Sequence, residues 1–516
     1  MSRRLFLRTL ATLLLAAVAT IPSTQAQSQN QSVRPSGNGE SVNDSLHDLQ
    51  AQVAELKSLV VSMRDEVEKS RAETLELRRE LESEHPQAQA ASPNKPSSNP
   101  PPGVSSIEQR LSKVEEDQAL LTDKVDDQYQ TKVESASKYR VRFSGIALFN
   151  LYNNVGSVDN QDFPEFAAAP VAGQSGNSLG GSFRQSELGF EVFGPDVLGA
   201  KTSANIQFDF AGGFPNAPNG IEFGLVRLRT GSARFDWGNT SIVAGQDTLF
   251  ISPLAPSSIA SIARPALSYS GELWSWTPQA RIEHRIALSD SSQLLLQGGV
   301  LASLSGEAPA ATYDRQPQAG ELSGQPAYAG RIAWSHQIFG RSLTIGQGGY
   351  YGRQNWGFDR NVNAWASTTD WNFPLAPRFD LSGEFYRGRA VGGLGGGLGE
   401  SALFLGTVAN PATVVRGLDS MGGWGQLKFR ATDKLEFNGA FGQDNPFASE
   451  LWLAAEWQQI YPNLSLTRNQ SSLANFIYRP RSDLLFSVEY LHLKTFTLPS
   501  SASSADHVSM NLGVLF

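Results

Sequence analysis

The chain has 516 residues, among them 42 Lys and Arg, 50 Asp and Glu and no cysteine, for a formal net charge of -8 at pH 7. The lack of cysteine excludes disulfide bonds and thiol catalysis, and it suits a protein that crosses an oxidising compartment unfolded. The acidic balance argues against nucleic acid as a partner, because nucleic-acid binding needs a basic patch.

Residues 1–26 have the pattern of a secretory signal peptide. Three arginines form a basic start, and an apolar run follows over residues 10–21. This run is shorter than the roughly 20 apolar residues that span a bilayer, and Ala26 ends a small-x-small cleavage site. We therefore expect an exported protein whose mature chain begins near Gln27. The alternative is a retained membrane anchor.

Two heptad segments precede the rest of the chain. Residues 27–44 are polar and are expected to be disordered, whereas 45–84 and 106–136 repeat apolar residues at spacings of three and four, as in a coiled coil. The apolar positions include Leu49, Val53, Leu56, Val60, Met63, Val67, Ile107, Leu111, Val114, Leu121 and Val125. Residues 85–105 are rich in Pro and Ser and read as an extended linker. A coiled coil needs partner chains, so it predicts a homo-oligomer; the alternative is an amphipathic helix on a surface.

Residues 137–516 change to segments of about ten residues in which apolar and polar side chains alternate, as in transmembrane β-barrels. Short turns and long Gly-, Pro- and Ser-rich loops separate these segments in turn, which is the usual asymmetry of such barrels. The tally is 16 strands if residues 447–464 form a loop and 17 if they form a strand. Because single-chain bacterial barrels have even counts, the pattern predicts an all-β, 16-stranded antiparallel barrel.

The C-terminal strand carries the clearest signal. Every second residue is apolar, and the chain stops on an aromatic residue; the positions are Val508, Met510, Leu512, Val514 and Phe516. A strand with one apolar face and a terminal Phe is typical of the strand that closes an outer-membrane barrel. Closure removes the sheet edges that lipid cannot satisfy.

Sixteen strands leave an aqueous lumen, and parity predicts which side chains face it. Seven arginines fall opposite the lipid-facing residues and are candidate pore-lining residues: Arg140, Arg142, Arg227, Arg229, Arg281, Arg285 and Arg331. A ring of arginines in a constriction selects anions. The alternative is that these arginines pair with carboxylates of neighbouring strands and only shape the field; the candidate partners are Glu187, Glu191, Asp209 and Glu283.

Several stretches resemble DcaP-like outer-membrane porins and, more distantly, the phosphate-selective porin O/P group. They are Phe183–Phe190, Ala204–Phe210, Val226–Arg229, Ala244–Asp247 and Gly383–Arg389. The resemblance implies trimeric channels with arginine-lined pores for small organic anions such as dicarboxylates. It also covers the glycine-rich residues 392–399, which either fold back over the pore or form a flexible surface loop.

Enzyme motifs are poor. Ser487 lies on the opposite strand face from His492, so these two residues do not form the Ser–His pair that a barrel hydrolase needs. Residues 394–399 lack the lysine of a phosphate loop. We expect no catalytic residues, no cofactor and no metal site.

The sequence thus predicts an outer-membrane porin, a passive diffusion channel for small hydrophilic solutes with a preference for anions such as dicarboxylates or phosphate. Its expected partners are copies of itself, as a trimer, the outer-membrane lipids, and the barrel-assembly machinery through the C-terminal strand. The coiled coil would lie in the periplasm. The alternative is a structural tether or adhesin that links the envelope layers through the coiled coil.

Overall fold

The computed structural model describes residues 139–516, apart from residues 174, 215–223, 308–314, 455–465 and 499–500. The predicted signal peptide, N-terminal segment, coiled coils and linker lie outside this part of the chain. Within it, no helix is long and apolar enough to cross a membrane.

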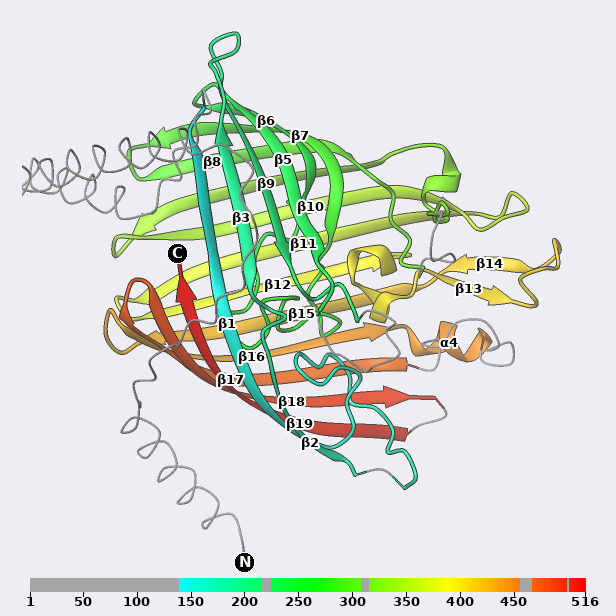
Figure 1. Cartoon of the computed structure of the whole chain (residues 1–516). Coiled ribbons are helices and arrows are strands. Elements are labelled where there is room, and N and C mark those ends of the chain that lie inside the picture. The colour runs from blue at the N-terminus through cyan, green and yellow to red at the C-terminus, as the bar shows by residue number, and fades with distance from the viewer. Residues whose placement is uncertain (1–138, 174, 215–223, 308–314, 455–465, 499–500) are drawn as a thin grey trace, which may run out of the picture. The chain divides into compact units, whose positions relative to one another are not determined.

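One antiparallel sheet makes up most of the molecule (Figure 1). Its first half contains β1 (Val141–Val155), β2 (Asn177–Ser182), β3 (Glu187–Phe193), β4 (Lys201–Asp209), β5 (Arg227–Asp236), β6 (Thr240–Thr248), β7 (Trp276–Ser289), β8 (Ser292–Leu301) and β9 (Ala327–Ile338). Its second half contains β10 (Arg341–Asn355), β11 (Asn361–Ala376), β12 (Phe379–Arg389), β15 (Asp419–Arg430), β16 (Leu435–Pro446), β17 (Leu466–Arg481), β18 (Leu484–Thr497) and β19 (Ser501–Leu515).

Smaller elements lie in the long connections. A separate two-stranded sheet contains β13 (Ala402–Leu405) and β14 (Val414–Gly417). The helices are η2 (Glu321–Ser323), η3 (Gly392–Leu394), η4 (Gly397–Gly399) and α4 (Ala448–Ala454). In Figure 1, β13, β14 and α4 lie at one end of the barrel and the short turns at the other. By the rule for such barrels, the end with the short turns faces the periplasm.

The sheet closes on itself. β19 pairs antiparallel with β1, for example Ile146 with Leu515, and the backbone N–H of Gly145 donates to the carbonyl of Phe516 at 2.9 Å. β2 and β3 both pair with β1, one after the other, so they are a single wall strand interrupted at residues 183–186. The seventeen strand ranges therefore form a 16-stranded barrel, as predicted from the sequence.

The structure extends the barrel into one stretch that sequence patterning assigns to a loop. Residues 177–182 form β2, although their sequence is polar and glycine-rich. Pairing with β1 holds them, because Gly180 lies under the ring of Tyr152 and Gly181 under that of Phe149. A glycine covered by an aromatic ring of the next strand is a known way to stabilise a weak strand.

Alternation along the strands separates an apolar outer surface from a polar interior. In β7, Ile282 is 54% exposed on the outside, whereas the next residue, Glu283, is 5% exposed on the inside. In β9, Ile332 and Trp334 are exposed, and Arg331 is buried. Side chains that face outward meet lipid in such barrels, so the exposed apolar residues are in their expected solvent.

Candidate functional site

A long connection between β6 and β7 enters the lumen. We call residues 249–275 the inner loop. It meets the wall on one side through Thr368 of β11, whose hydroxyl donates to the carbonyl of Ile251 at 2.6 Å. Next along the loop, the backbone N–H of Leu254 donates to the carboxylate of Glu384 on β12 at 2.8 Å.

The same loop reaches strands far around the wall. Asn475 of β17 donates to the carbonyl of Ser257 at 2.8 Å. Gln185, in the interruption between β2 and β3, donates to the carbonyl of Ala260 at 2.6 Å. Since these strands lie in different parts of the ring, the inner loop crosses the lumen and narrows it.

Apolar residues of the inner loop turn part of the lumen into a packed core. Leu249, Phe250, Ile251 and Leu273 pack against inward-facing residues of β8 to β12, among them Leu301, Ala327, Ala329, Tyr350, Ala364 and Tyr386. Burying this much apolar surface fixes the loop against one side of the wall. Two further clusters, around Leu267 and Ile259, pack the same loop against β15 to β19 and against β1, so the loop is also held on other sides of the lumen.

The glycine-rich segment folds inward as well. We call residues 390–401 the glycine loop. The backbone N–H of Trp274 in the inner loop donates to the carbonyl of Leu394 at 2.9 Å, and that of Gly397 donates to the hydroxyl of Tyr386 at 2.9 Å. A Cβ on Gly396 would lie 2.8 Å from the side chain of Leu273, so the contact requires glycine. Of the two interpretations of residues 392–399, the structure supports the one in which the segment folds over the pore.

The predicted arginines lie mostly beside carboxylates. Six of the seven form ion pairs: Arg142 with Glu191, Arg227 with Asp209, Arg229 with Asp209 and Glu187, Arg281 with Asp247 and Glu283, Arg285 with Glu283, and Arg331 with Asp370. The guanidinium of Arg140 lies 4.4 Å from the ring centre of Phe193. All four carboxylates that the sequence suggests as partners form ion pairs with these arginines.

A bulge in β5 brings three of its arginines to the inner face. The register shifts opposite Gln207 and Phe208. Odd-numbered residues of β5 therefore face the lumen before the bulge, and even-numbered residues face it after the bulge. Arg227 and Arg229 donate to the inner-loop carbonyls of Ala263 and Ile262, at 2.7 and 3.0 Å. These two arginines therefore fasten the loop to the wall.

We call the β5 and β7 arginines and their acids the arginine wall. It contains Arg227, Arg229, Arg234, Arg281 and Arg285 together with Glu187, Asp209, Asp236, Asp247 and Glu283. Glu283 alone contacts three of the arginines. Positive and negative groups are equal in number here, so much of the arginine charge is compensated by acidic neighbours.

A second basic group lies between the inner loop and the end of the barrel with the short turns, and we call it the basic basin. It contains Arg341, Lys428, Arg430 and Arg479 around Asp380 and Glu436. Asp380 pairs with Arg341 at 2.5 Å and also with Arg430; Glu436 pairs with Arg479 at 3.6 Å and Lys428 at 3.8 Å. None of the basin's cations is among the seven predicted arginines, although Lys428 and Arg430 alternate with the apolar Leu427 and Phe429.

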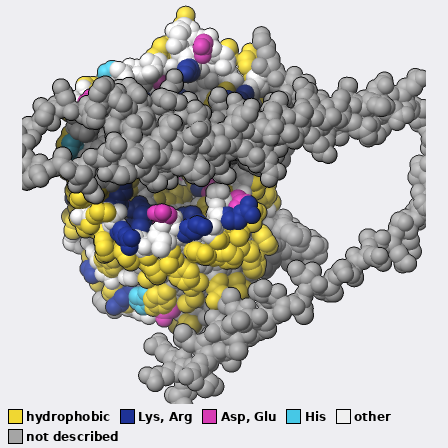
Figure 2. Space-filling view, turned by 90° about the vertical axis from the view of Figure 1, so that its left-hand side faces the viewer, with side chains coloured by type: hydrophobic (Ala, Val, Ile, Leu, Met, Phe, Trp, Pro, Cys, Tyr) yellow, Lys and Arg dark blue, Asp and Glu magenta, His cyan; other side chains and the backbone are white. Residues whose placement is uncertain are grey.

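The basin borders a cavity of about 370 Å³ between the inner loop and the wall. Leu254 and Ser257 of the inner loop form one side, and Arg341, Lys428 and Arg430 form part of the other. Arg341 begins β10 and Arg430 ends β15, so both lie at the end with the short turns. Figure 2 looks onto this end, where Lys and Arg side chains gather with few Asp and Glu among them.

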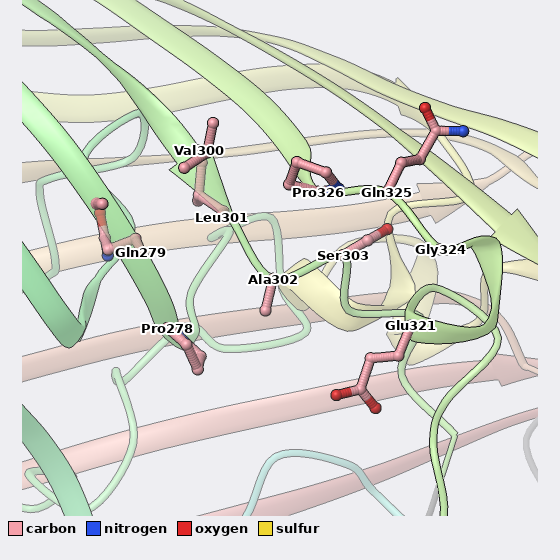
Figure 3. Close-up of a pocket in the computed structure, with 11 residues that line it drawn as sticks. Pro278, Gln279, Val300, Leu301, Ala302, Ser303, Glu321, Gly324, Gln325 and Pro326 are labelled. Atoms are coloured by element: carbon pink, nitrogen blue, oxygen red, sulfur yellow. The ribbon is translucent and has the colours of Figure 1, made fainter.

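A larger hollow of about 460 Å³ lies elsewhere, between β7, β8 and the start of β9 (Figure 3). It is lined largely by apolar and amide side chains such as Pro278, Val300 and Gln325. Its charged residue, Glu321, pairs with Arg315 at 2.6 Å. Because Val300 is exposed on the outer surface, this hollow lies on the side of the barrel and is not the candidate site.

Charged groups in the loops also pair with one another. Arg264 of the inner loop pairs with Glu165, and burial raises the pKa of Glu165 although this arginine lowers it. Asp162 pairs with Arg184 at 2.5 Å. The residues that the structure describes hold no cluster of three His, Asp or Glu that could bind a metal ion.

A closed barrel of sixteen strands that leaves a lumen is the architecture of porins in bacterial outer membranes. The outer membrane channel DcaP of Acinetobacter baumannii has this fold: it is 17% identical, with a TM-score of 0.55 over 75% of this chain and 100% of its own. The expected DcaP-like, outer-membrane barrel is thereby confirmed at the level of the fold.

Weaker likenesses come from two other channels. An anion-selective porin from Comamonas acidovorans is 11% identical, with a TM-score of 0.44 over 73% of this chain and 100% of its own. OmpF of Salmonella typhi, in complex with daunomycin, is 9% identical, with a TM-score of 0.44 over 75% of this chain and 100% of its own. No protein-family model and no curated protein matches the chain.

Proposed function

We propose that this protein is an outer-membrane porin, a passive diffusion channel for small hydrophilic solutes that prefers anions such as dicarboxylates or phosphate. The closed 16-stranded barrel with a loop across its lumen carries the proposal. A wall of sixteen strands is too wide for its own side chains to fill, so a water-filled passage remains where the inner loop is not packed.

The preference for anions is supported by the cations that border the lumen. Arginine offers a planar fork of N–H donors that matches carboxylate and phosphate oxygens. We place the seven predicted arginines in this lining, and six of them lie close to a carboxylate. The effect of these arginines on ion permeation therefore depends on how far the neighbouring carboxylates neutralise their charge.

Reversal potentials of the purified protein in planar bilayers, under a gradient of potassium chloride, test the proposal. An anion-preferring pore gives a potential of the sign set by chloride. A protein that inserts without conducting would contradict the porin function itself, whereas a cation-preferring pore would contradict only its selectivity.

The trimer and the periplasmic coiled coil belong to the same proposal and rest on the heptads of residues 45–84 and 106–136. Deleting residues 46–128 should leave a conducting barrel with weaker association between copies, because the apolar seam is lost. Native mass spectrometry in mild detergent gives the oligomeric state. A full-length protein that is monomeric under these conditions would contradict the heptad argument.

A further inference from the structure

We propose that the basic basin is a binding site for a small dianionic oxyanion, such as phosphate or a short dicarboxylate, on the periplasmic side of the inner loop. The inference rests on the proposed porin function and adds a place and a cause for its selectivity. It assigns the stronger discrimination to Lys428 and Arg430, two residues outside the seven predicted arginines.

Positive charge exceeds negative charge in the basin. In the described part of the chain, the basin brings together four cations and two carboxylates, each carboxylate being shared by two cations. The arginine wall has as many carboxylates as arginines. Two positive charges are thus left over in the basin, which matches a ligand with two negative charges.

The basin also has hydrogen-bond donors to spare. A guanidinium carries five N–H donors. Asp380 engages Nη1 of Arg341 through one oxygen and Nη1 of Arg430 through the other, so neither contact is a two-pronged fork. Arg341 also donates through Nη2 to the carbonyl of Ala376, which still leaves donors of both arginines for oxygens of a ligand. Each such charge-assisted bond is stronger than a neutral one.

Cations and acids of the basin alternate across neighbouring strands. Lys428 of β15 lies opposite Asp380 of β12 in the sheet register, and Arg430 lies opposite Glu436 of β16. The four cations consequently surround the two acids instead of stacking in one row. A ligand bridging the two ion-pair groups would meet a cation from each.

The basin has room for a small ligand and lies near the periplasmic end. The adjoining cavity of about 370 Å³ is bounded by Ser257 of the inner loop and by the side chains of Arg341, Lys428 and Arg430. This volume admits a phosphate or a four-carbon dicarboxylate together with some water. A solute that has passed the inner loop from outside reaches the basin before it leaves at the periplasmic end.

The test uses the full-length protein in planar bilayers, with phosphate and succinate added separately to potassium chloride. Both probes should reduce the chloride current in wild type at low millimolar concentration. The double variant Lys428→Gln/Arg430→Gln should weaken this block at least tenfold. It removes two charges while Glu436 keeps Arg479 and Asp380 keeps Arg341, so no buried acid loses all its partners.

The matched control is Lys201→Gln/Arg481→Gln, which removes two exposed positive charges near the same end of the barrel and should leave the block within twofold. Block by one probe alone identifies that oxyanion as the ligand class. A conducting, correctly folded Lys428/Arg430 variant with wild-type block by both probes overturns the basin.

If the double variant does not insert, as judged by the heat-modifiable gel shift, each single variant replaces it and should weaken block at least threefold. Unchanged block in both single variants likewise overturns the proposal. Failure of the porin function is distinct, because wild type itself would then carry no current.

Discussion

The arginine wall and the basic basin face the same lumen but differ in how their charges are matched. On the wall, Glu283 alone contacts Arg234, Arg281 and Arg285, yet acids and bases are equal in number over the whole group. In the basin, Asp380 and Glu436 each serve two cations. The number of arginines in a pore is therefore a poor guide to its field, whereas the ratio of cations to acids in each region is informative.

The largest effect is expected from breaking a balanced pair. Arg331→Ala should destabilise the barrel by about 3–5 kcal/mol, because it leaves the carboxylate of Asp370 buried and unpaired. The two side chains are only 6% and 1% exposed and meet at 2.7 Å. Urea unfolding in lipid vesicles measures the loss. Arg331→Met/Asp370→Asn should recover most of it, and an equally unstable double variant would contradict the role of charge.

A smaller effect is expected from unbalancing the wall. Arg281→Ala/Arg285→Ala should move the reversal potential towards cations by about twofold in permeability ratio, since Asp247 and Glu283 keep their charge and salt screens part of it. Conservative Ile282→Val and Ile286→Val serve as controls on the lipid side. Unchanged selectivity would show that these arginines are neutralised wall charges.

The third prediction concerns the passage that both regions border. Gly393→Ala should displace the glycine loop and raise single-channel conductance, because a Cβ there would lie 2.6 Å from the backbone nitrogen of Ser305. Gly298→Ala is the control, since its Cβ meets nothing within 4 Å. Equal conductance in both variants would show that the glycine loop does not narrow the pore.

The smallest effect is a pH dependence of the same loop. Burial, and secondarily Glu307, raises the pKa of Glu400 from 4.5 to about 7. Because the packed loop binds this proton more tightly than the exposed one, its stability is greatest below about pH 4.5, falls as pH rises to about 7 and stays lower above. Conductance should rise modestly over this window, and Glu400→Gln should flatten the rise. A slope unchanged by Glu400→Gln would assign the titration to another group.

The wall of the barrel was predictable because it follows from a two-residue period. Alternation and the terminal Phe516 identified the closing strand, and β19 indeed pairs with β1. β2 was missed because Asn177–Ser182 has no apolar alternation and depends on aromatic rings of its neighbour. The residue types within this segment do not indicate a contact with rings of the neighbouring strand.

The site was predictable only in part. Parity tells which side of a strand a residue faces, so it led to arginines such as Arg281. It does not tell the height in the pore or the number of acids nearby, which required the register of several strands. The alternation along β10 does not predict that Arg341 faces the lumen, because this residue begins the strand on the face opposite to Gly346, Gly348 and Tyr350. Its side chain turns inward at the strand end and reaches Asp380.

The bulge in β5 has a consequence for how this wall can be altered. The extra residue shifts the alternation of side chains within one strand. Arg227 and Arg229 have odd numbers and Arg234 an even one, yet all three face inward. If β5 were a regular strand over the same sequence, with no extra residue at the bulge, one end of it would turn inside out and carry its arginines towards lipid. The wall can therefore be transplanted into another barrel only if this irregularity is transplanted with it.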